Sequence, residues 1–430
     1  MRKKILETST ITAGTKNSRD LYYRHNCKLI LLFLVLVFPM EYYSQGLPDS
    51  LIQNAMKVSF VHLGKSVLEV KDSTRFPSYA THNLEWSYFK SDGWTSGFYP
   101  GCLWLAYELS GRNEFISWAK KWTSGLEQEK NNRGTHDLGF MFECSYGNGI
   151  KFVPREEAPA YKDILINAAI TLDKRYSPNV GMLRCYWDVS PFNQDTTLFP
   201  VVVDIMMNLE LLFWGAENGA PKSLREHAIS HANKSYRDFV RADGSTYHVV
   251  RYNKNSGEII NKGQLQGQNA NSTWTRGHAW FIYGMTVCCR YTRDEKFLEK
   301  ACALADYFLG RLTPDNVSVW DFDSLPEFSG IKDASATAIV SSALFELSTY
   351  INDGARKALY LKKATDMLAA LCSKEYLAER ENTNAILLHS TQYLTQPGNQ
   401  NTDKPAIFAD YYFLEAMKRY LTLKKTGMLF

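Results

Sequence analysis

Apolar residues recur at helical spacing along most of the chain, and short polar turns separate the periodic segments. An apolar residue every three to four positions over a long stretch is typical of an amphipathic helix. The turns carry the Gly, Pro, Asn and Asp residues that end helices, as in Asn218-Gly219-Ala220-Pro221. The pattern therefore predicts twelve helices, near residues 48–68, 97–110, 113–129, 138–149, 156–173, 200–217, 221–241, 276–291, 294–311, 333–349, 354–373 and 406–423.

The long interval between residues 241 and 276 does not follow this pattern. Ser245–Val250 and Ile259–Asn261 have strand character and predict a small hairpin. Twelve helices with short connections and no regular alternation with strands exclude a doubly wound sheet. Helices joined as consecutive hairpins favour an all-α closed toroid, in which six inner helices line a cavity and six outer helices cover them. A superhelical array of helix pairs is the alternative, but we find no sequence repeat typical of such arrays.

The composition is that of an ordinary globular protein, with 45% hydrophobic and 22% charged residues among 430. The net charge of +4 gives no strong field for nucleic acid, so we expect no nucleic-acid partner. No linker rich in Gly, Ser or Pro divides the chain, which predicts a single domain over residues 47–430. The eight cysteines include no CxxC pair and no Cys/His cluster with zinc spacing, which predicts buried free thiols and no metal site.

The N-terminus has the organisation of a secretory signal peptide. Basic residues precede the apolar run Leu29–Phe38, and a small-residue cleavage site follows at Ser44-Gln45-Gly46. The run is too short for a membrane span, which needs about 20 apolar residues. Residues 1–46 are therefore predicted to be a signal peptide, with a buried N-terminal element as the alternative. We expect an exported protein, located in the periplasm, with no stable membrane insertion after the signal is removed.

One carboxylate stands alone in the apolar segment Phe199–Trp214. Asp204 is the only charge in the first part of this predicted helix, and Asn208 shares its face and could hydrogen-bond the carboxylate. Burial raises the pKa of such an acid, and an acid that stays protonated near neutral pH can donate a proton. Asp204 is thus a candidate general acid, and a buried Asp with a structural partner is the alternative.

A second carboxylate, Asp137, lies in the segment Thr135–Phe140 at the start of another predicted helix. It could serve only as a helix N-cap. Two carboxylates with apolar flanks nevertheless form the pattern expected of a glycosidase.

A third candidate segment runs from Gln264 to Trp280. Arg276 and Trp280 are four residues apart and share one helical face. An Arg fork binds a carboxylate and a Trp ring stacks on a sugar, so the pair predicts a clamp for an anionic sugar. An Arg stacked on a Trp in the core is the alternative. His248, on the predicted hairpin, and Trp94, before a predicted helix, are weaker candidates when each is taken alone.

Taken together, these segments resemble the unsaturated glucuronyl hydrolases, glycoside hydrolase family 88. The resemblance rests on the residues of seven short segments and on their order along most of the chain. They are Asp92–Phe98, His136–Phe140, Val203–Leu209, Thr246–Val249, Gln266–Gly267, Trp274–Trp280 and Asp410–Ala416.

The resemblance implies an (α/α)6 barrel and a glycoside hydrolase that needs neither cofactor nor metal. The implied partner is an oligosaccharide, made from a glycosaminoglycan by a lyase, from which the enzyme removes a non-reducing terminal 4,5-unsaturated uronic acid. We expect a monomer or a homodimer. The family's proton donor corresponds to Asp204 and its second essential acid to Asp137. The residues that the resemblance assigns to substrate binding are His248, Gln266, Trp274, Arg276 and Trp280, to which we add Trp94, His136 and Gln264 from the same regions.

Two alternatives stay open at this point. An unsaturated rhamnogalacturonyl hydrolase has a similar barrel and acts on pectin fragments, but the His-Asp-Leu-Gly-Phe and Trp-Thr-Arg segments favour the glucuronyl enzyme. A non-catalytic toroid that binds sugar is the other, and the presence of both Asp137 and Asp204 argues against it. The sequence departs from the family at His278, where Gln is common, and near Asn269–Asn271, where an acidic residue is common.

Overall fold

The computed structural model describes residues 46–81, 83–185, 197–392, 394 and 402–429. Contacts divide the chain after Gly46, and Leu47–Phe430 form one compact unit, which is the unit considered below. Residues 1–45 of the predicted signal peptide lie outside the described residues. Within the described ranges, no helix is long and apolar enough to cross a bilayer.

Each predicted helix has a counterpart in the structure, most with ends within a few residues of those expected. The described residues contain α2 (Asp49–Val70), α3 (Phe98–Ser110), α4 (Asn113–Ser124), α5 (Leu138–Phe142), α6 (Ala158–Asp173), α7 (Ile205–Asn218), α8 (Ser223–Phe239), α9 (Thr275–Thr292), α10 (Glu295–Arg311), α11 (Ala334–Leu347), α12 (Gly354–Leu371) and α13 (Ile407–Thr426). A π-helical turn, η3 (Glu143–Gly147), continues α5, and short 3-10 helices occur at η2 (Glu127–Asn131), η4 (Pro326–Phe328) and η5 (Ser348–Tyr350).

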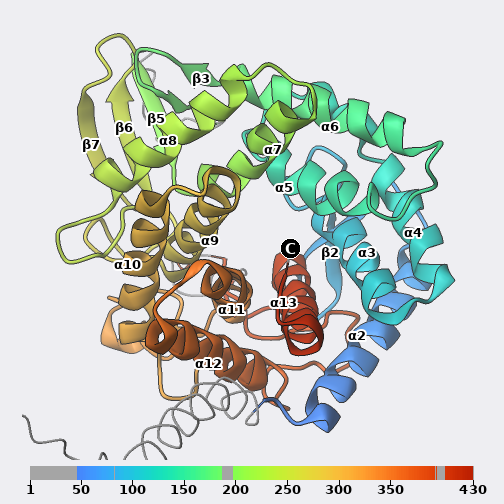
Figure 1. Cartoon of the computed structure of the whole chain (residues 1–430). Coiled ribbons are helices and arrows are strands. Elements are labelled where there is room, and N and C mark those ends of the chain that lie inside the picture. The colour runs from blue at the N-terminus through green and yellow to red at the C-terminus, as the bar shows by residue number, and fades with distance from the viewer. Residues whose placement is uncertain (1–45, 82, 186–196, 393, 395–401, 430) are drawn as a thin grey trace, which may run out of the picture. The chain divides into compact units, whose positions relative to one another are not determined.

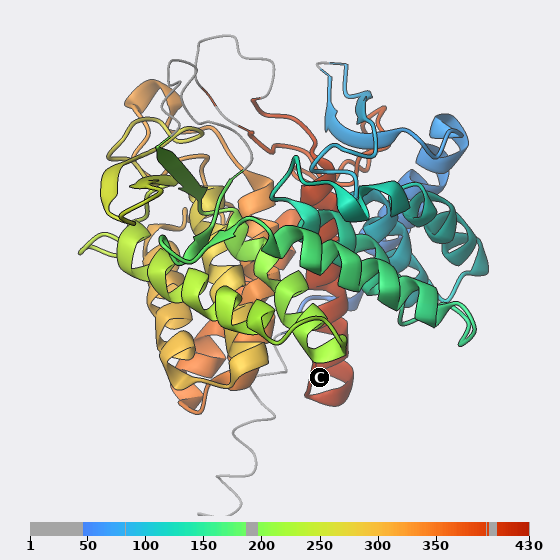
Figure 2. The ribbon, with the colours of Figure 1, turned by 90° about the horizontal axis from the view of Figure 1, so that it is seen from above.

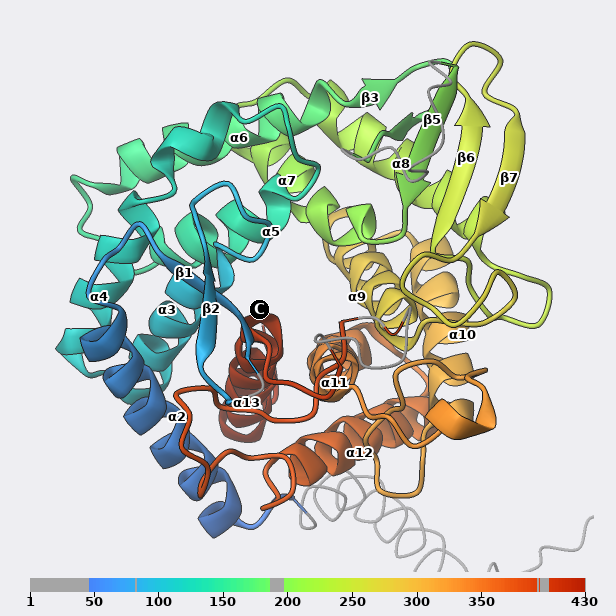
Figure 3. The same cartoon turned by 180° about the vertical axis from the view of Figure 1, so that it is seen from behind.

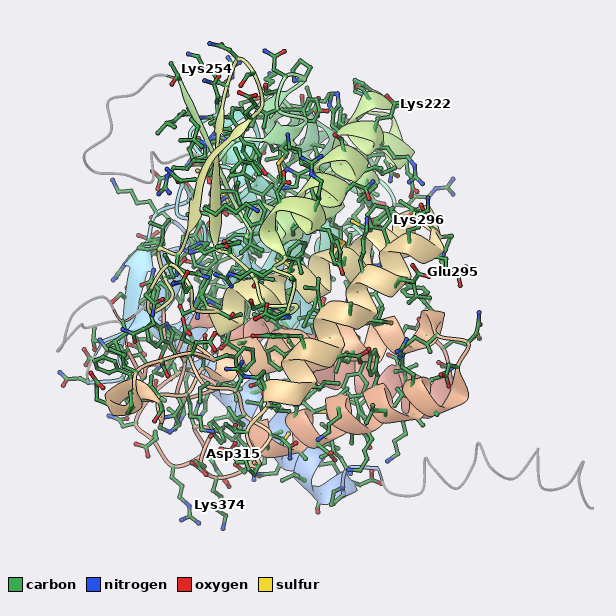
Figure 4. All side chains as sticks on the ribbon, turned by 90° about the vertical axis from the view of Figure 1, so that its left-hand side faces the viewer. Lys222, Lys254, Glu295, Lys296, Asp315 and Lys374 are labelled. Atoms are coloured by element: carbon green, nitrogen blue, oxygen red, sulfur yellow. The ribbon has the colours of Figure 1, made fainter. Side chains whose placement is uncertain are left out.

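Alternate helices form a closed inner ring (Figure 1). In the order α3, α5 with η3, α7, α9, α11 and α13, each packs against the next, and α13 also packs against α3. Every residue of α11 is buried, whereas the outer helix α10 is buried on one face. Charged side chains such as Lys222 and Glu295 mark the starts of outer helices on the surface (Figure 4). The ring confirms the predicted barrel and excludes the superhelical array.

Three antiparallel strands pack beside the ring, in the order β5 (Leu198–Val202), β6 (Val249–Asn253) and β7 (Ile259–Gly263). The β6–β7 hairpin confirms the one predicted. β5 corrects the expected start of the sixth helix, because Pro200 pairs with Arg251 in the sheet and α7 begins only at Ile205. A run of Val residues has no period that separates strand from helix, and the neighbouring strand decides between them here.

The short hairpins β1 (Phe76–Ala80) with β2 (Trp86–Phe89) and β3 (Tyr176–Ser177) with β4 (Met182–Leu183) complete the structure. Figure 2 shows loops and strands gathered at one end of the barrel, with the C-terminal end of α13 at the other. Figure 3 looks onto that loop-bearing end, where β1 and β2 lie in front of the inner helices. The residues that precede the inner helices therefore meet at one mouth of the ring.

Candidate active site

Asp204 occupies the N-cap position of α7 and lies beside an imidazole from the small sheet. Its Oδ2 is 3.3 Å from Nε2 of His248, whose side chain is fully buried. The side chain of Asp204 remains 19% exposed, so it can touch a bound molecule. The structure thus brings together two predicted site residues that are far apart in the sequence.

The backbone fixes the tautomer of His248. Its Nδ1 accepts hydrogen bonds from the N–H groups of Leu265 and Gln266, at 3.3 and 3.2 Å. A nitrogen that accepts two hydrogen bonds carries no proton, so Nε2 carries the hydrogen and points it toward Asp204. Gln266 therefore contributes to the site through its backbone, while its side-chain amide donates to the carbonyl of Gln392 at 3.1 Å.

Asp137 is the N-cap residue of α5 and is buried, with only 4% of its surface exposed. Its Oδ2 accepts a hydrogen bond from the hydroxyl of Thr135 at 3.2 Å, and its Oδ1 lies 3.3 Å from Nε2 of His136. Burial lowers the pKa of His136 to about 3, so this imidazole is neutral at physiological pH. Asp137 thus has polar neighbours, and Arg175 is the cation whose charge acts to lower its pKa.

Asn208 connects the two carboxylate positions. Its Oδ1 accepts the N–H of Phe140 in the first turn of α5 at 3.0 Å, and its Nδ2 donates to the carbonyl of Asp204 at 3.2 Å. The amide also acts to lower the pKa of the nearby Asp137 carboxyl. The sequence predicted a bond from Asn208 to the Asp204 carboxylate, but the late start of α7 presents the carbonyl of Asp204 instead.

The two acids differ in proton affinity, and Asp204 does not have the raised pKa that its apolar sequence context predicts. Burial raises the pKa of Asp137 to about 7, and the nearby charge of Asp204 adds to the rise. Burial also acts to raise the pKa of Asp204, but the neighbouring His248, with a smaller contribution from His136, outweighs it and lowers the pKa below its usual value. Of the two acids, Asp137 is therefore the one that binds a proton more tightly.

Several buried polar atoms at this site have no hydrogen-bond partner among the described residues. They include Oδ2 of Asp204, Nε2 of His248, Nε1 of Trp274 and Oε1 of Gln264. The 3.3 Å approach of the first two is close enough for attraction, yet neither completes an aligned hydrogen bond. The rings of Trp274 and His248 are adjacent, with centroids 4.6 Å apart. Unpartnered buried donors and acceptors are costly, so this cluster is suited to a polar ligand.

The guanidinium of Arg276, which was predicted to clamp a ligand together with Trp280, is bound by protein groups. Nη1 lies 2.5 Å from Oδ2 of Asp333 and donates to the carbonyl of Thr391, and Nη2 donates to the carbonyl of Gln392 at 2.8 Å. Arg276 and Asp333 are both at most 1% exposed. The guanidinium also lies over the rings of Trp274 and Phe408, so the core stacking that was the alternative interpretation is present.

The ring of Trp280 is packed into an aromatic cluster. It is 1% exposed and contacts Phe140, Phe408 and Tyr412, with centroid separations of 5.1, 6.4 and 5.5 Å. In this conformation the ring presents no open face to a sugar. Gln264 is likewise engaged, since its amide donates to the carbonyls of Thr246 and Ser272 and ties the preceding loop to α9.

Trp94 lies at the rim of the site. It lines a cavity of about 410 Å³ together with Phe89, Lys90, Asp92, Asn132 and Thr135. Thr135 also donates a hydrogen bond to Asp137, so the cavity extends to the part of the barrel mouth where Asp137 lies. An aromatic ring beside polar side chains is suited to a sugar.

Two residues of the site were not predicted in their present roles. Asp333, at the start of the helix predicted near 333–349, caps α11 by accepting the N–H of Ser335 at 3.2 Å, and it is also the ion-pair partner of Arg276. The sequence placed Asn208 on the same helix as Asp204 and did not indicate that its side chain also bonds α5. The departure at His278 is structural, because its Nε2 lies 2.8 Å from the carbonyl of Leu304. In the described part of the chain, no group of three or more His, Cys, Asp or Glu side chains could hold a metal ion, so no residue is assigned to one.

The chain is similar in sequence and fold to several known hydrolases. No model of a protein family matches the chain. An unsaturated glucuronyl hydrolase of Formosa agariphila is 44% identical over 333 residues, which are 76% of this chain and 80% of that protein.

Two crystal structures have the same fold. One is an unsaturated glucuronyl hydrolase specific for heparin, with a TM-score of 0.81 and 35% identity, covering 88% of this chain and 99% of the other. The second is the unsaturated glucuronyl hydrolase of Bacillus sp. GL1, responsible for the degradation of glycosaminoglycan. It has a TM-score of 0.79 and 27% identity, covering 87% of this chain and 97% of the other.

Proposed function

This chain belongs to the unsaturated glucuronyl hydrolase family, and from that premise we propose how its site removes a 4,5-unsaturated uronic acid from a glycosaminoglycan oligosaccharide. The chain is a glycosidase. The observation that carries the proposal is the pair of buried acids, Asp137 and Asp204, of which one holds a proton near neutral pH.

The substrate's double bond joins C4 and C5, is conjugated with the carboxylate, and bears the ring oxygen, so it is a vinyl ether. A proton adds to C4, and the oxygen of a water molecule adds to C5 while the water gives up a proton to a carboxylate. The hemiketal formed at C5 then opens and releases the next sugar. The reaction needs one acid that donates a proton and becomes the base for the water.

We assign both steps, donation of the proton to C4 and acceptance of a proton from water, to Asp204. Its side chain is 19% exposed, compared with 6% for that of Asp137, so Asp204 is the acid that a substrate can contact. An anionic uronate bound beside Asp204 raises the pKa of this carboxyl by charge repulsion. The higher pKa favours movement of the proton from Asp137 to Asp204. Asp137 then serves as the site that holds the proton before substrate arrives.

The unpartnered donors of the site fit an anionic sugar. The N–H groups of His248 and Trp274 lack acceptors among the described residues, and substrate oxygen atoms would supply them. The mouth also lies at the N-terminal ends of the inner helices, where the helix dipoles favour negative charge. The relatives named for heparin and for glycosaminoglycan degradation support the same substrate class.

The test follows the ultraviolet absorbance of the conjugated uronate in unsaturated disaccharides from hyaluronan, chondroitin and heparin. Asp204→Asn keeps the shape and removes the proton, so we expect kcat to fall about 100-fold or more with the fold intact. Asp294→Asn is the matched control, because Asp294 is an N-cap of the outer helix α10. Near-wild-type turnover by Asp204→Asn would refute the assignment. Activity only on unsaturated pectin fragments would favour a rhamnogalacturonyl hydrolase.

We also propose that residues 1–46 direct export to the periplasm and are removed. The support is the basic region, the short apolar run and the small-residue site that follows it. A lyase acting on the parent polysaccharide outside the cytoplasm would supply substrate in the same compartment.

A further inference from the structure

We propose that Asn208 is a positioning residue that ties the start of α5, which carries Asp137, to the start of α7, which carries Asp204, and thereby sets the relative proton affinities of the two acids. The inference rests on the function proposed above. It concerns a side chain that does not itself reach the open part of the site, since Asn208 is fully buried.

The hydrogen bonds of Asn208 cross between two inner helices. An amide side chain offers one acceptor atom and two donor hydrogens. Asn208 uses its acceptor on the N–H of Phe140 in α5 and a donor on the carbonyl of Asp204 at the N-cap of α7, and its amide also lowers the pKa of the neighbouring Asp137 carboxyl. Because each of these groups belongs to the first turn or N-cap of α5 or α7, the amide ties the two carboxylate-bearing helix ends to each other.

The backbones approach closely at this point. A Cβ atom on Gly139 would lie 2.5 Å from Cα of Asn208, which is far closer than atoms can pack. Only glycine at position 139 therefore lets the start of α5 reach α7. The close approach and the amide bridge act on the same pair of helix ends, and both are needed to hold the acids together.

The bridge also acts on the proton. A hydrogen bond donated to an ionised carboxylate favours the ionised form, so Asn208 holds the pKa of Asp137 lower than burial alone would set it. The other titratable groups around Asp137 are Asp204 at the start of α7, His136 beside it, Arg175 after α6 and His248 immediately before β6. Burial keeps His136 neutral, so the two acids, Arg175 and the amide bridge set the proton balance.

The experiment compares Asn208→Ser with Asn218→Ser in the same helix. Asn218 donates its amide to the carbonyl of Trp214 at 2.9 Å, which is the same bond to the residue four positions earlier, but it lies at the far end of α7. Asn208→Ser removes the amide beside Asp137 and adds no charge, so Asp137 retains its proton to higher pH. We expect the alkaline limb of the kcat/KM profile to move up by about one pH unit. We expect kcat to fall about tenfold through misalignment, with little change in KM.

A merely structural role predicts a different result. Asn208→Ser would then lower kcat in proportion to the folded fraction at every pH and leave the alkaline limb where Asn218→Ser and the wild type have it. That outcome would overturn the inference. If Asn208→Ser does not fold, Asn208→Thr takes its place, because it fills more of the space, also removes the amide without adding a charge, and moves the limb in the same direction.

The wild type separates this inference from the proposed function. If the wild type leaves the absorbance of every unsaturated disaccharide unchanged, the proposed function fails. If the wild type is active and the profile of the Asn208 variant matches it, only the role of Asn208 fails.

Discussion

Replacing Asp333 by Asn removes one charge from a fully buried ion pair and keeps the shape of the side chain. Asp333 and Arg276 are each at most 1% exposed, and their atoms approach to 2.5 Å. Removing one partner of such a pair leaves the other charge buried, which costs about 3–5 kcal/mol. With an unfolding entropy of about 2 cal/mol/K per residue, about 4 kcal/mol lowers the melting temperature of a unit of this size by about 5 °C.

The companion variant is Arg276→Met, which removes the guanidinium and retains much of its apolar stem. Burial already raises the pKa of Asp333, and Arg276 is the main influence that lowers it, so in this variant the acid holds a proton to higher pH. We expect the double variant to be destabilised by about 3 kcal/mol less than the sum of the single variants, because it leaves no unpaired charge.

Calorimetry of the four proteins measures this coupling, and kinetics on an unsaturated disaccharide complete the test. If Arg276 instead exchanged Asp333 for the substrate carboxylate during binding, Asp333→Asn would free the guanidinium. The variant would then have a lower KM and little change in stability. Additive stability losses together with a lower KM for Asp333→Asn would refute the structural role of the pair. A large coupling without improvement in KM supports it.

Three further outcomes are expected. Asp137→Asn should abolish turnover yet raise the melting temperature above pH 7 relative to the wild type. The reason is that the folded pKa of about 7 exceeds the unfolded one, so wild-type stability falls as pH rises from about 4 through 7; equal pH dependence in calorimetry would contradict this. Trp280→Ala should lower the free energy of unfolding by about 3–5 kcal/mol and leave the KM of the folded fraction unchanged. A raised KM would instead show that the Trp280 ring stacks on the substrate. Denatured protein from the native host should titrate seven thiols and begin near Leu47 by mass spectrometry, since Cys27 is lost with the signal; eight thiols and an intact N-terminus would contradict export.

The helices could be predicted because their apolar periodicity is long and their turns are marked by Gly, Pro and Asn. The start of α7 could not, since Phe199–Val203 has no period and becomes a strand only because β6 lies beside it. That error of five residues moved Asp204 from a position within a helix to its N-cap. It also changed the predicted partner of Asn208 from the Asp204 carboxylate to the Asp204 carbonyl.

The residues of the candidate site could likewise be predicted only in part. Asp137, Asp204 and His248 could be singled out from their local context and from the family resemblance. Spacing within one helix suggested that Arg276 faces a ligand, but its acidic partner Asp333 is 57 positions away, and no local pattern reveals such a contact. Proton affinities were equally out of reach, because they depend on which imidazole and which amide fold against each acid.

The closure of the ring by α13 against α3 has a consequence for how the protein is made. α3 begins at Phe98 and α13 ends at Thr426, so the first and last walls of the cavity are synthesised at opposite ends of the unit. Until the ribosome has released α13, the sides of α3 and α11 that it covers stay open, and these are apolar surfaces of the kind that aggregate or recruit chaperones. The active cavity is therefore completed only late in biosynthesis. Loss of α13 alone should leave five inner helices, an open ring and no enzymatic activity.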